Sequence, residues 1–380
     1  MLAASRNLKM ARSAHAYVRG NTAKFYDWLA AVSAAVPDGP PIWICGDCHV
    51  GNLGPVANAA GQVEIQIRDL DQTVIGNPAH DLIRLGLSLA SAARGSDLPG
   101  VTTVRILEQL IDGYEGAFDG ASERAGSPGT VNLVMQEALG RSWKHLARER
   151  IGDERPSIPL GKRFWPLSPE ESADLAGLFA RDDVRQLVTL LHKRDDRAEI
   201  ELLDAAYWVK GCSSLGRLRA AVLVRVGARE QCLIDIKEAV QAAAPRSPKA
   251  RMPRDNAERV VEGARHLAPH LGERMLAARL GERAVFLREL RPQDLKVEIA
   301  QVDRDEAMAV AHFLAGVVGH AHARQMDPPS RRRWQAELKR GRSKTLDAPG
   351  WLWAATVELM AAHEAAYLEH CRRFALDEAA

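Results

Sequence analysis

Residues 46–52, with the sequence GDCHVGN, directly follow a short apolar run at residues 41–45 (PIWIC). An apolar run that stops at a glycine predicts a buried strand that enters a loop. Residues 63–68 (VEIQIR) alternate apolar and polar side chains, so they predict a second strand, which delivers Asp69 at its end. The sequence therefore places Asp47 and Asn52 in a loop after the first strand, and Asp69 about one hairpin later, at the end of the second.

This set of side chains suits metal-assisted phosphoryl transfer. In that chemistry one carboxylate orients the attacking hydroxyl, while an amide oxygen and a second carboxylate hold the Mg²⁺ ion that neutralises the phosphates. Asp47 and Asn52 offer the first carboxylate and the amide, and Asp69 offers the second carboxylate. Asp71 follows two residues later and is either another metal ligand or a residue that flanks the site.

The composition is that of an ordinary globular protein. Of the 380 residues, 46% are hydrophobic and 26% are charged, which allows two lobes with a substantial core. A net charge of +2 gives no reason to expect nucleic acid or a membrane as a partner. The first residues lack a continuous apolar core, and no stretch approaches a membrane span, so we expect no signal peptide and a cytoplasmic location. The five cysteines lack framework spacing and are expected to be reduced thiols.

Hydrophobic periodicity separates helical from β-rich segments. Residues 12–36 and 79–94 predict helices, and residues 117–200 are mostly helical in pattern, with loops rich in Gly, Pro and Ser. The β-rich material follows at residues 207–240 and 283–290. The elements predicted in this later part are strands at 220–226, 232–237 and 284–290 and helices at 256–267 and 306–324.

A turn rich in glycine and serine and a lysine on an apolar strand indicate a nucleotide site. Residues 211–216 (GCSSLG) precede the strand at 220–226, and backbone N–H groups in such a turn can approach phosphates closely. The same composition is also typical of a plain hairpin turn. Lys237 ends the next strand, where an unpaired buried lysine is costly, so it is expected to pair with the α- and β-phosphates. The candidate nucleotide-binding residues are Gly211, Ser213, Ser214, Gly216 and Lys237.

A carboxylate from the following helix is the expected partner of Lys237. Glu258 and Glu262 lie one turn apart on the helix predicted at 256–267, so both share one face and either residue can serve. At least one of them is a solvated surface charge. His320 and His322, on the later helix, do not share a face, which argues against paired metal ligation there. They are expected to be packing or capping groups, one of which contacts the catalytic loop.

Three other motifs have alternative interpretations. Cys45, Cys48 and His49 match a haem-attachment or Cys-x-x-Cys metal pattern, but no second cysteine pair completes a zinc site, so two small buried side chains are expected. The basic run at 331–344 is interpreted as a solvated helix face rather than a nucleic-acid surface. Residues 161–166 form either an acceptor-binding loop or a structural loop.

The loop at 46–52 resembles the catalytic loop of aminoglycoside phosphotransferases and choline kinases. Asp69 resembles the metal-binding aspartate of those enzymes, and Asp81 resembles a structural aspartate that follows it. The order of the segments, together with residues 17–20 (YVRG) and 236–239 (IKEA), is similar to the bacterial family labelled domain of unknown function 2252. This similarity covers nearly the whole chain.

The resemblance implies a role for each matching residue. Asp47 would be the base or the residue that orients the hydroxyl, and His49 belongs to the same catalytic motif. Asn52 and Asp69 would be Mg²⁺ ligands, and Lys237 would hold the α- and β-phosphates of ATP. The turn at 211–216 departs from the family of protein kinases because it contains fewer glycines than their loop.

The order of these segments predicts a circular permutation. In kinase-like enzymes the catalytic loop follows the nucleotide-binding half, whereas here it precedes that half. The same site forms from a permuted chain if the two termini lie close together on the helical lobe. We therefore expect an α+β, protein-kinase-like, two-lobed fold. Its helical lobe would comprise residues 1–205 and 292–380, and its smaller β-rich nucleotide lobe residues 206–291.

The expected function is ATP- and Mg²⁺-dependent phosphotransfer to a small acceptor that bears a hydroxyl or an amine. The partners are then the nucleotide and this small molecule, with no nucleic acid and no membrane. Residues 117–200 are the expected source of acceptor specificity, because additions to a scaffold often carry it. Two alternatives remain open: nucleotidyl transfer to a protein, and a non-catalytic module that binds nucleotide.

Overall fold

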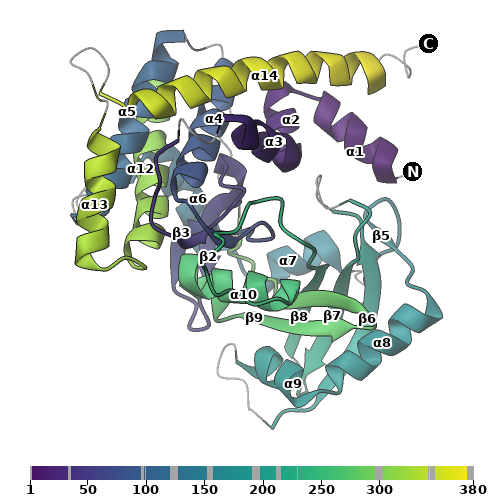
Figure 1. Cartoon of the computed structure of the whole chain (residues 1–380). Coiled ribbons are helices and arrows are strands. Elements are labelled where there is room, and N and C mark those ends of the chain that lie inside the picture. The colour runs from purple at the N-terminus through teal and green to yellow at the C-terminus, as the bar shows by residue number, and fades with distance from the viewer. Residues whose placement is uncertain are drawn as a thin grey trace.

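The protein is described here from a computed structural model. Its chain is described over residues 2–32, 36–95, 98, 100–119, 127–151, 157–190, 197–210, 215–228, 230–295, 303–340, 342 and 347–374. A mainly helical region and a region built on an antiparallel sheet lie side by side (Figure 1). The fold is therefore of the mixed α+β class, as the sequence predicts.

The strands fall into a short N-terminal group and a longer central group. They are β1 (Ile42–Ile44), β2 (Leu53–Ala57), β3 (Val63–Ile67), β4 (Val74–Gly76), β5 (Phe164–Trp165), β6 (Ile200–Trp208), β7 (Arg219–Val226), β8 (Glu230–Glu238), β9 (Met275–Leu280) and β10 (Arg283–Glu289).

The helices lie before, within and after the central strands. They are α1 (Leu2–Ala11), α2 (Ala14–Gly20), α3 (Thr22–Val32), α4 (Ala79–Gly95), α5 (Gly100–Gly116), α6 (Gly129–Gly140), α7 (Trp143–Arg150), α8 (Pro169–Phe179), α9 (Asp182–Thr189), α10 (Asn256–Leu267), α11 (Pro269–Gly272), α12 (Arg304–Ala323), α13 (Pro328–Lys339) and α14 (Gly350–Phe374).

The largest sheet is six-stranded, with the order β5-β6-β7-β8-β10-β9. Every neighbouring pair in it is antiparallel. In the chain, α10 and α11 lie between β8 and β9. In the sheet, β8 pairs with β10, and β9 lies at the edge beyond it. Two small antiparallel pairs, β1 with β4 and β2 with β3, lie apart from this sheet and carry the loops that interest us below.

The two faces of the large sheet have different partners. Successive residues of a strand point to opposite faces, so Ile236 and Lys237 lie on opposite sides of β8. Ile236 belongs to an apolar cluster with Leu175 of α8 and Val184 of α9. On the face of Lys237, α10 packs against β9 and β10. Val260 of α10 lies in the same apolar cluster as Phe286, the register partner of that lysine. The helices α8 and α9 therefore cover the face that points away from Lys237 (Figure 1).

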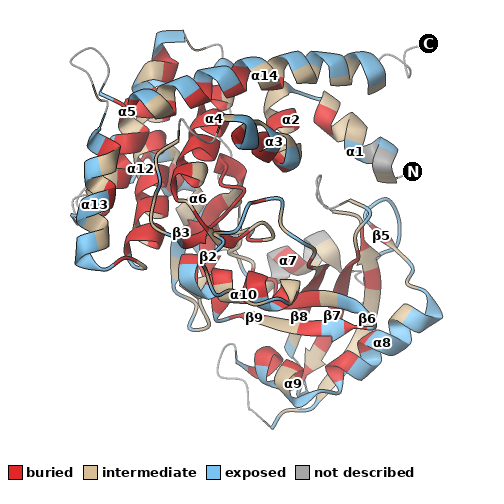
Figure 2. Ribbon diagram, in the orientation of Figure 1, coloured by how far each residue is buried: buried red, intermediate tan, exposed pale blue. Residues whose placement is uncertain are grey.

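The core of the helical region is formed by α4, α5 and α12. Leu82, Ile83 and Leu85 of α4 are fully buried, and so are Leu107 of α5 and Leu314 of α12. In Figure 2 these helices carry many buried residues, interrupted by intermediate and exposed ones. Because α4 is apolar on nearly every side, it can hold the polar side chains that point from it toward β1 in fixed positions.

The first and last helices of the described chain lie against each other. The Tyr367 hydroxyl of α14 donates a hydrogen bond of 3.0 Å to the carbonyl of Ala11. His370 lies 2.8 Å from the carbonyl of Asn7, and its ring packs against Tyr17 of α2. The sequence-based hypothesis of a permuted chain required neighbouring terminal segments, and these contacts supply that arrangement (Figure 1).

Several sequence predictions differ from the structure at the level of elements. The strand β6 begins at Ile200, so the predicted lobe boundary at 205/206 falls within a strand. The strand β9 was not predicted. Residues 164 and 165 of the loop with two interpretations form β5, where Phe164 stacks on Trp208 of β6, which fits the structural interpretation.

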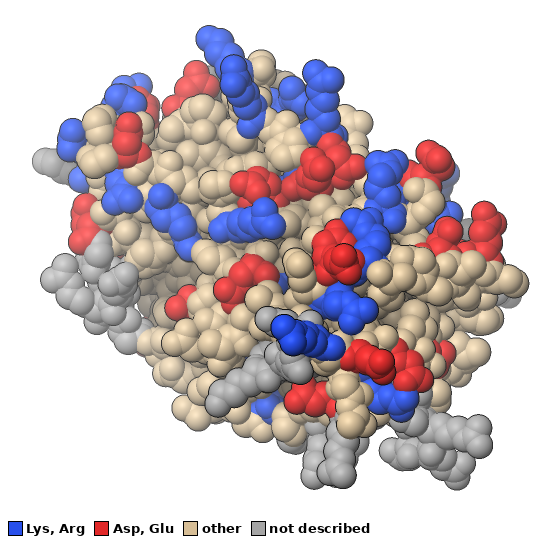
Figure 3. Space-filling model, turned by 90° about the horizontal axis from the view of Figure 1, so that it is seen from below, with Lys and Arg blue, Asp and Glu red and all other residues tan. Residues whose placement is uncertain are grey.

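The surface charges are mixed in sign. On the face seen in Figure 3, basic and acidic side chains are interspersed rather than gathered into a patch of one sign. Within the described ranges, no helix is long and apolar enough to cross a membrane.

Candidate active site

The backbone at Gly46, the first residue of the loop at 46–52, has a conformation that requires glycine. Gly46 has a φ of +74°, in the left-handed region that favours glycine. A Cβ at this position would lie 2.2 Å from the backbone oxygen of Gln72. The loop after β1 and the loop between β3 and β4 therefore pack backbone to backbone, which fixes Asp47 relative to Asp69.

We expect Gly46→Ala to destabilise the fold by about 2 kcal/mol or more, because it combines a left-handed φ with a backbone clash. Gly61 is a matched control, since its φ is +87° but its nearest neighbour is a side-chain nitrogen of Arg291 at 3.8 Å. Gly61→Ala should therefore lower the free energy of unfolding only through its left-handed φ, by about 1 kcal/mol. Urea unfolding measures both, and equal losses in the two variants would contradict the close packing of the loops.

Asp81 of α4 holds the start of the loop. Its carboxylate is fully buried and accepts hydrogen bonds from the backbone N–H groups of Cys45, at 2.7 Å, and Gly46, at 2.9 Å. The same carboxylate lies 3.2 Å from Nε2 of His322 at the end of α12. One of the two histidines of this helix was expected to contact the loop itself, whereas His322 contacts Asp81, which in turn holds the loop.

A chain of hydrogen bonds fixes the tautomer of His322. The Trp334 indole donates to the Tyr114 hydroxyl oxygen at 3.0 Å, and that hydroxyl lies 2.9 Å from Nδ1 of His322. The Asp81 carboxylate accepts, so Nε2 of His322 donates to it, and Nδ1 of the neutral ring then accepts from the Tyr114 hydroxyl. All these groups are buried, so α5, α12 and α13 together orient the carboxylate that holds the loop.

Asp47 lies in a buried polar pocket. Arg84 of α4, which is fully buried, donates from Nε to Oδ1 of Asp47 at 3.0 Å and from Nη2 to the carbonyl of Val18 at 2.8 Å. Burial raises the pKa of Asp47, and the Arg84 guanidinium opposes this rise. Nε2 of His49 lies 3.8 Å from Oδ2 of the same carboxylate. Asp47 is thus oriented by protein groups and retains a small exposed fraction, 8%.

Asn52 and His49 complete the loop. The Asn52 amide donates to the backbone carbonyl of Asp47 at 3.0 Å, which leaves its amide oxygen as an acceptor. Burial, followed by the nearby charges of Arg19 and Arg84, lowers the pKa of His49 well below its ordinary value. The imidazole of His49 is therefore neutral at physiological pH.

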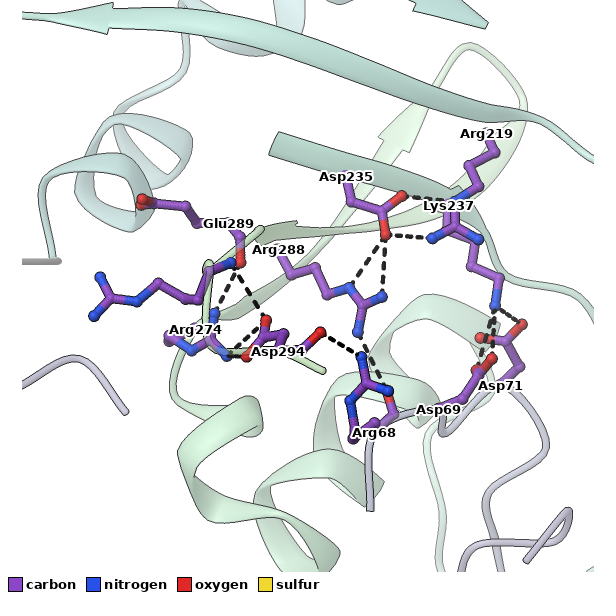
Figure 4. A network of polar contacts seen from close by, with 11 residues as sticks. Arg68, Asp69, Asp71, Arg219, Asp235, Lys237, Arg274, Arg288, Glu289 and Asp294 are labelled. Carbon is purple, nitrogen blue, oxygen red and sulfur yellow. Dashed lines mark hydrogen bonds and ion pairs between the residues drawn. The ribbon is translucent and has the colours of Figure 1, made fainter. Parts of the chain in front are cut away.

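Lys237 meets the two aspartates that follow β3 (Figure 4). Its ammonium lies 3.3 Å from Oδ1 of Asp69 and also contacts Oδ2 of Asp71. Desolvation opposes ionisation at Asp69, but the charges of Lys237, Arg288 and Arg219 and the hydrogen bond with Asp71 together outweigh it and lower the pKa of this carboxyl. At Asp71, desolvation and the charge of Asp69 raise the pKa to about 6. Residues 168 positions apart in the sequence thus form one ionic cluster beside the loop at 46–52.

The carboxylate partner of Lys237 therefore differs from the one predicted on α10. Glu258 is exposed, and Glu262 lies 3.3 Å from both Arg265 and His266 of its own helix. The contribution of α10 comes instead from Arg259, which is 3% exposed.

Arg259 joins the loop between β3 and β4 to the segment that follows β8. Its guanidinium donates to the carbonyls of Thr73 and, at 3.1 Å, Asp71, and to that of Val240 at 2.8 Å. Asp71 and Lys237 are thereby held together through the backbone as well as through their side chains. A cavity of about 560 Å³ adjoins this guanidinium, lined among others by Val74, Arg246, Met252 and Arg254, and does not include Asp47 or Lys237.

Sequence reasoning missed a second ionic cluster on the same face of the sheet. Arg219 binds both oxygens of Asp235, at 2.8 and 2.6 Å, and Arg288 lies 3.1 Å from one of them. Arg219 is the register partner of Lys237, so this cluster adjoins the lysine (Figure 4). Lys210, whose pKa burial lowers to about 6, lies over the ring of Trp208 nearby. This cluster could have been found from the sequence, because charged residues recur at alternate positions of otherwise apolar strands, where a buried charge requires a partner.

The predicted phosphate-binding turn is only partly described. Gly211, Ser213 and Ser214 lie outside the described residues. Gly216 has a φ of +96° with open space around it, consistent with a glycine turn between β6 and β7. Cys45 and Cys48 are buried free thiols, as expected from the interpretation that they are small packing groups.

Comparison with known proteins defines the family of the chain. A family model described as an uncharacterized protein conserved in bacteria (DUF2252) matches residues 1–373. No curated protein and no solved structure matches the chain. Because the model covers nearly the full length, the chain belongs to the DUF2252 family.

Proposed function

We propose that the protein is an ATP- and Mg²⁺-dependent phosphotransferase that acts on a small acceptor with a hydroxyl or an amine. The observation that carries this proposal is the convergence of Lys237 with Asp69 and Asp71 beside the loop at 46–52. Phosphoryl transfer is mostly a matter of positioning and electrostatic stabilisation, and it requires a lysine, acidic metal ligands and a hydroxyl-orienting carboxylate in one place.

The donor set fits Mg²⁺. Carboxylate and amide oxygens are the ligands that this ion prefers, and it is usually held by one or two carboxylates together with water and substrate phosphates. Among the residues that the structure describes, no three His, Cys, Asp or Glu side chains form a complete metal cage. Asn52, Asp69 and Asp71 would thus bind Mg²⁺ weakly by themselves, and the nucleotide would complete the coordination of the ion, which would offset phosphate charge.

The protein groups divide the remaining tasks. Asp47, oriented by Arg84, would accept a hydrogen bond from the acceptor hydroxyl, and its raised pKa suits it to take up the proton. Lys237 would turn from the aspartates toward the α- and β-phosphates once these arrive. Arg219 and Arg288 keep Asp235 neutralised, so that the surface beside Lys237 stays favourable to an anion.

We further propose that the fold is a circularly permuted, kinase-like arrangement. The side chain of Gln325, just after α12, accepts from the N–H of Trp43 at 2.9 Å and donates to its carbonyl at 3.1 Å. The end of α12 thus lies against β1, the strand that leads into the loop at 46–52. A chain that ran directly from α12 into β1 would have the kinase-like order. In a permuted chain that link is cut and the original termini are joined elsewhere, and the adjacency of α1 and α14 supports a rearrangement of this kind.

Incubation with Mg²⁺ and ATP that carries label at either the α- or the γ-phosphate tests the proposal. We expect label from the γ position to leave ATP and label from the α position to remain in ADP, with none attached to an acceptor or to the protein. Label from the α position attached to an acceptor or to the protein, with release of pyrophosphate, would favour nucleotidyl transfer. The absence of any Mg-ATP binding, measured by thermal shift, would contradict both enzymatic functions and the nucleotide-binding module.

Asp69→Asn is expected to lower Mg-ATP turnover by at least about a hundredfold, because the amide removes charge that the transferred phosphoryl group and its ion require. Asp112 offers a control, since its side chain is 71% exposed on α5 and remote from the loop. Initial rates of ADP release measure the effect. Equal rates for Asp69→Asn and Asp112→Asn would remove Asp69 from the site.

A further inference from the structure

The helix α2 presents two side chains to the loop at 46–52. His15 and Arg19 lie one turn apart, so they share a helix face. The Arg19 guanidinium packs directly on Gly51, where an added Cβ would lie 2.4 Å from its Nη2 atom. Any side chain in place of Gly51 would push the guanidinium away, so the contact between α2 and the loop depends on this glycine.

Arg19 has a charge without a counterpart. Within the described part of the chain its guanidinium makes no hydrogen bond and no ion pair, although it is partly buried. The neighbouring His15 adds no second charge, because burial and the charges of Arg19 and Arg84 lower its pKa to about 4. The same three causes lower the pKa of His49. A cation near two neutral imidazoles offers a site for an anion.

The two imidazoles have unused hydrogen-bonding atoms. Nδ1 of His49 and Nδ1 of His15 are buried, and neither has a partner in the structure. His49 is only 4% exposed, and its other ring nitrogen lies 3.8 Å from Asp47. Buried polar atoms in proteins nearly always have a partner, so an unpaired pair of nitrogens beside an unpaired cation indicates a ligand.

We propose that Arg19, with His15 and His49, binds an anionic group of the acceptor, a phosphate or a carboxylate. The inference rests on the proposed phosphotransferase function and specifies its substrate class: an anionic compound that also carries the reacting hydroxyl or amine. Arg19 lies on α2 of the helical region, whereas Lys237 approaches from the sheet. The acceptor anion and the nucleotide phosphates are therefore bound by different elements, with Asp47 between them.

Inorganic phosphate is the probe, titrated calorimetrically into the full chain in the presence of saturating Mg²⁺ and the β,γ-imido analogue of ATP. The analogue fills the position of the transferred phosphate, so phosphate that still binds occupies another site. We expect the Arg19→Ala variant to bind phosphate at least about tenfold more weakly, the loss typical of one charge-assisted contact. Arg12→Ala, at an exposed arginine just before α2, should bind as the wild type does.

Gly51→Ala provides a second variant that keeps Arg19. Its new methyl group meets the flexible end of the arginine, so it should displace the guanidinium at little cost in stability and weaken phosphate binding in the same way. Far-ultraviolet circular dichroism and the midpoint of thermal unfolding establish that each variant is folded.

Two results would overturn the anion site: phosphate affinity unchanged by Arg19→Ala, and no phosphate binding by the wild type at millimolar concentration. Competition between phosphate and the analogue for one site would overturn its assignment to the acceptor and place Arg19 at the transferred phosphate. If the analogue fails to bind but phosphate binds in an Arg19-dependent way, the phosphotransferase proposal falls and the anion site stands.

Discussion

Replacing Lys237 with methionine is expected to tighten the binding of Mg²⁺ alone while it abolishes turnover of Mg-ATP. The ammonium lies between Asp69 and Asp71, where it offsets the charge that a divalent ion would meet. One charge at this range contributes on the order of 1–4 kcal/mol, so its removal should tighten Mg²⁺ binding about tenfold. Loss of the contact to the nucleotide phosphates should lower turnover by at least about a hundredfold.

These opposite effects separate a direct role of Lys237 from general damage to the fold, which would weaken both properties. Mg²⁺ affinity follows from the rise in the unfolding midpoint with ion concentration, and turnover follows from ADP release. Lys249→Met, at an exposed lysine of the loop before α10, is the matched control and should change neither. Mg²⁺ affinity in Lys237→Met equal to that of the wild type would refute the ionic cluster as the metal site.

Local patterns in the sequence predicted the elements that carry the site. The run at 41–45 and the alternation at 63–68 became β1 and β3, and both strands end at the expected loops. The helix predicted at 256–267 is found as Asn256–Leu267, with Asp255 as its N-cap. Short-range signals sufficed there because strand alternation and helix capping are decided by adjacent residues.

The partners of the charged side chains could not be predicted in the same way. Lys237 and Asp71 meet because β8 pairs with β10, and because Arg259 fastens the end of β8 to the loop after β3. Neither contact leaves a pattern in the local sequence. The helix spacing of Glu258 and Glu262 was interpreted correctly as one face, but the rotation of α10 turns Arg259 toward the site. Sheet order and helix rotation are set by packing over the whole chain.

The position of the helical segment at 117–200 relative to the site could not be predicted from the sequence either. The whole segment was expected to shape acceptor specificity, and its later helices, α8 and α9, cover the face of the sheet that lies opposite Lys237. The residues of α2 that approach the loop at 46–52, His15 and Arg19, come from the other end of the chain. Amphipathic patterning identified the helices, but it does not specify which apolar surface each one covers.

Asp81→Ala is expected to destabilise the protein by about 3 kcal/mol or more, the largest loss we predict for a single polar side chain. The substitution leaves three buried donors without an acceptor: the N–H groups of Cys45 and Gly46 and the Nε2–H of His322. Each orphaned donor costs about 1–3 kcal/mol. Asp81→Asn keeps one oxygen as an acceptor, but its amide hydrogens face other donors, so its loss should be smaller and still above 1 kcal/mol.

The result also bears on the candidate active site, because Asp81 acts on it only through the backbone. Urea unfolding gives the stability of each variant, and Asp27→Ala, at an exposed position of α3, should fall within about 0.5 kcal/mol of the wild type. At temperatures where Asp81→Asn stays folded, we expect its turnover of Mg-ATP to fall while Mg²⁺ binding at Asp69 and Asp71 persists, since only the loop at 46–52 loses its support. A stability of Asp81→Ala equal to that of Asp27→Ala would show that the buried hydrogen bonds from α4 and α12 do not hold this loop.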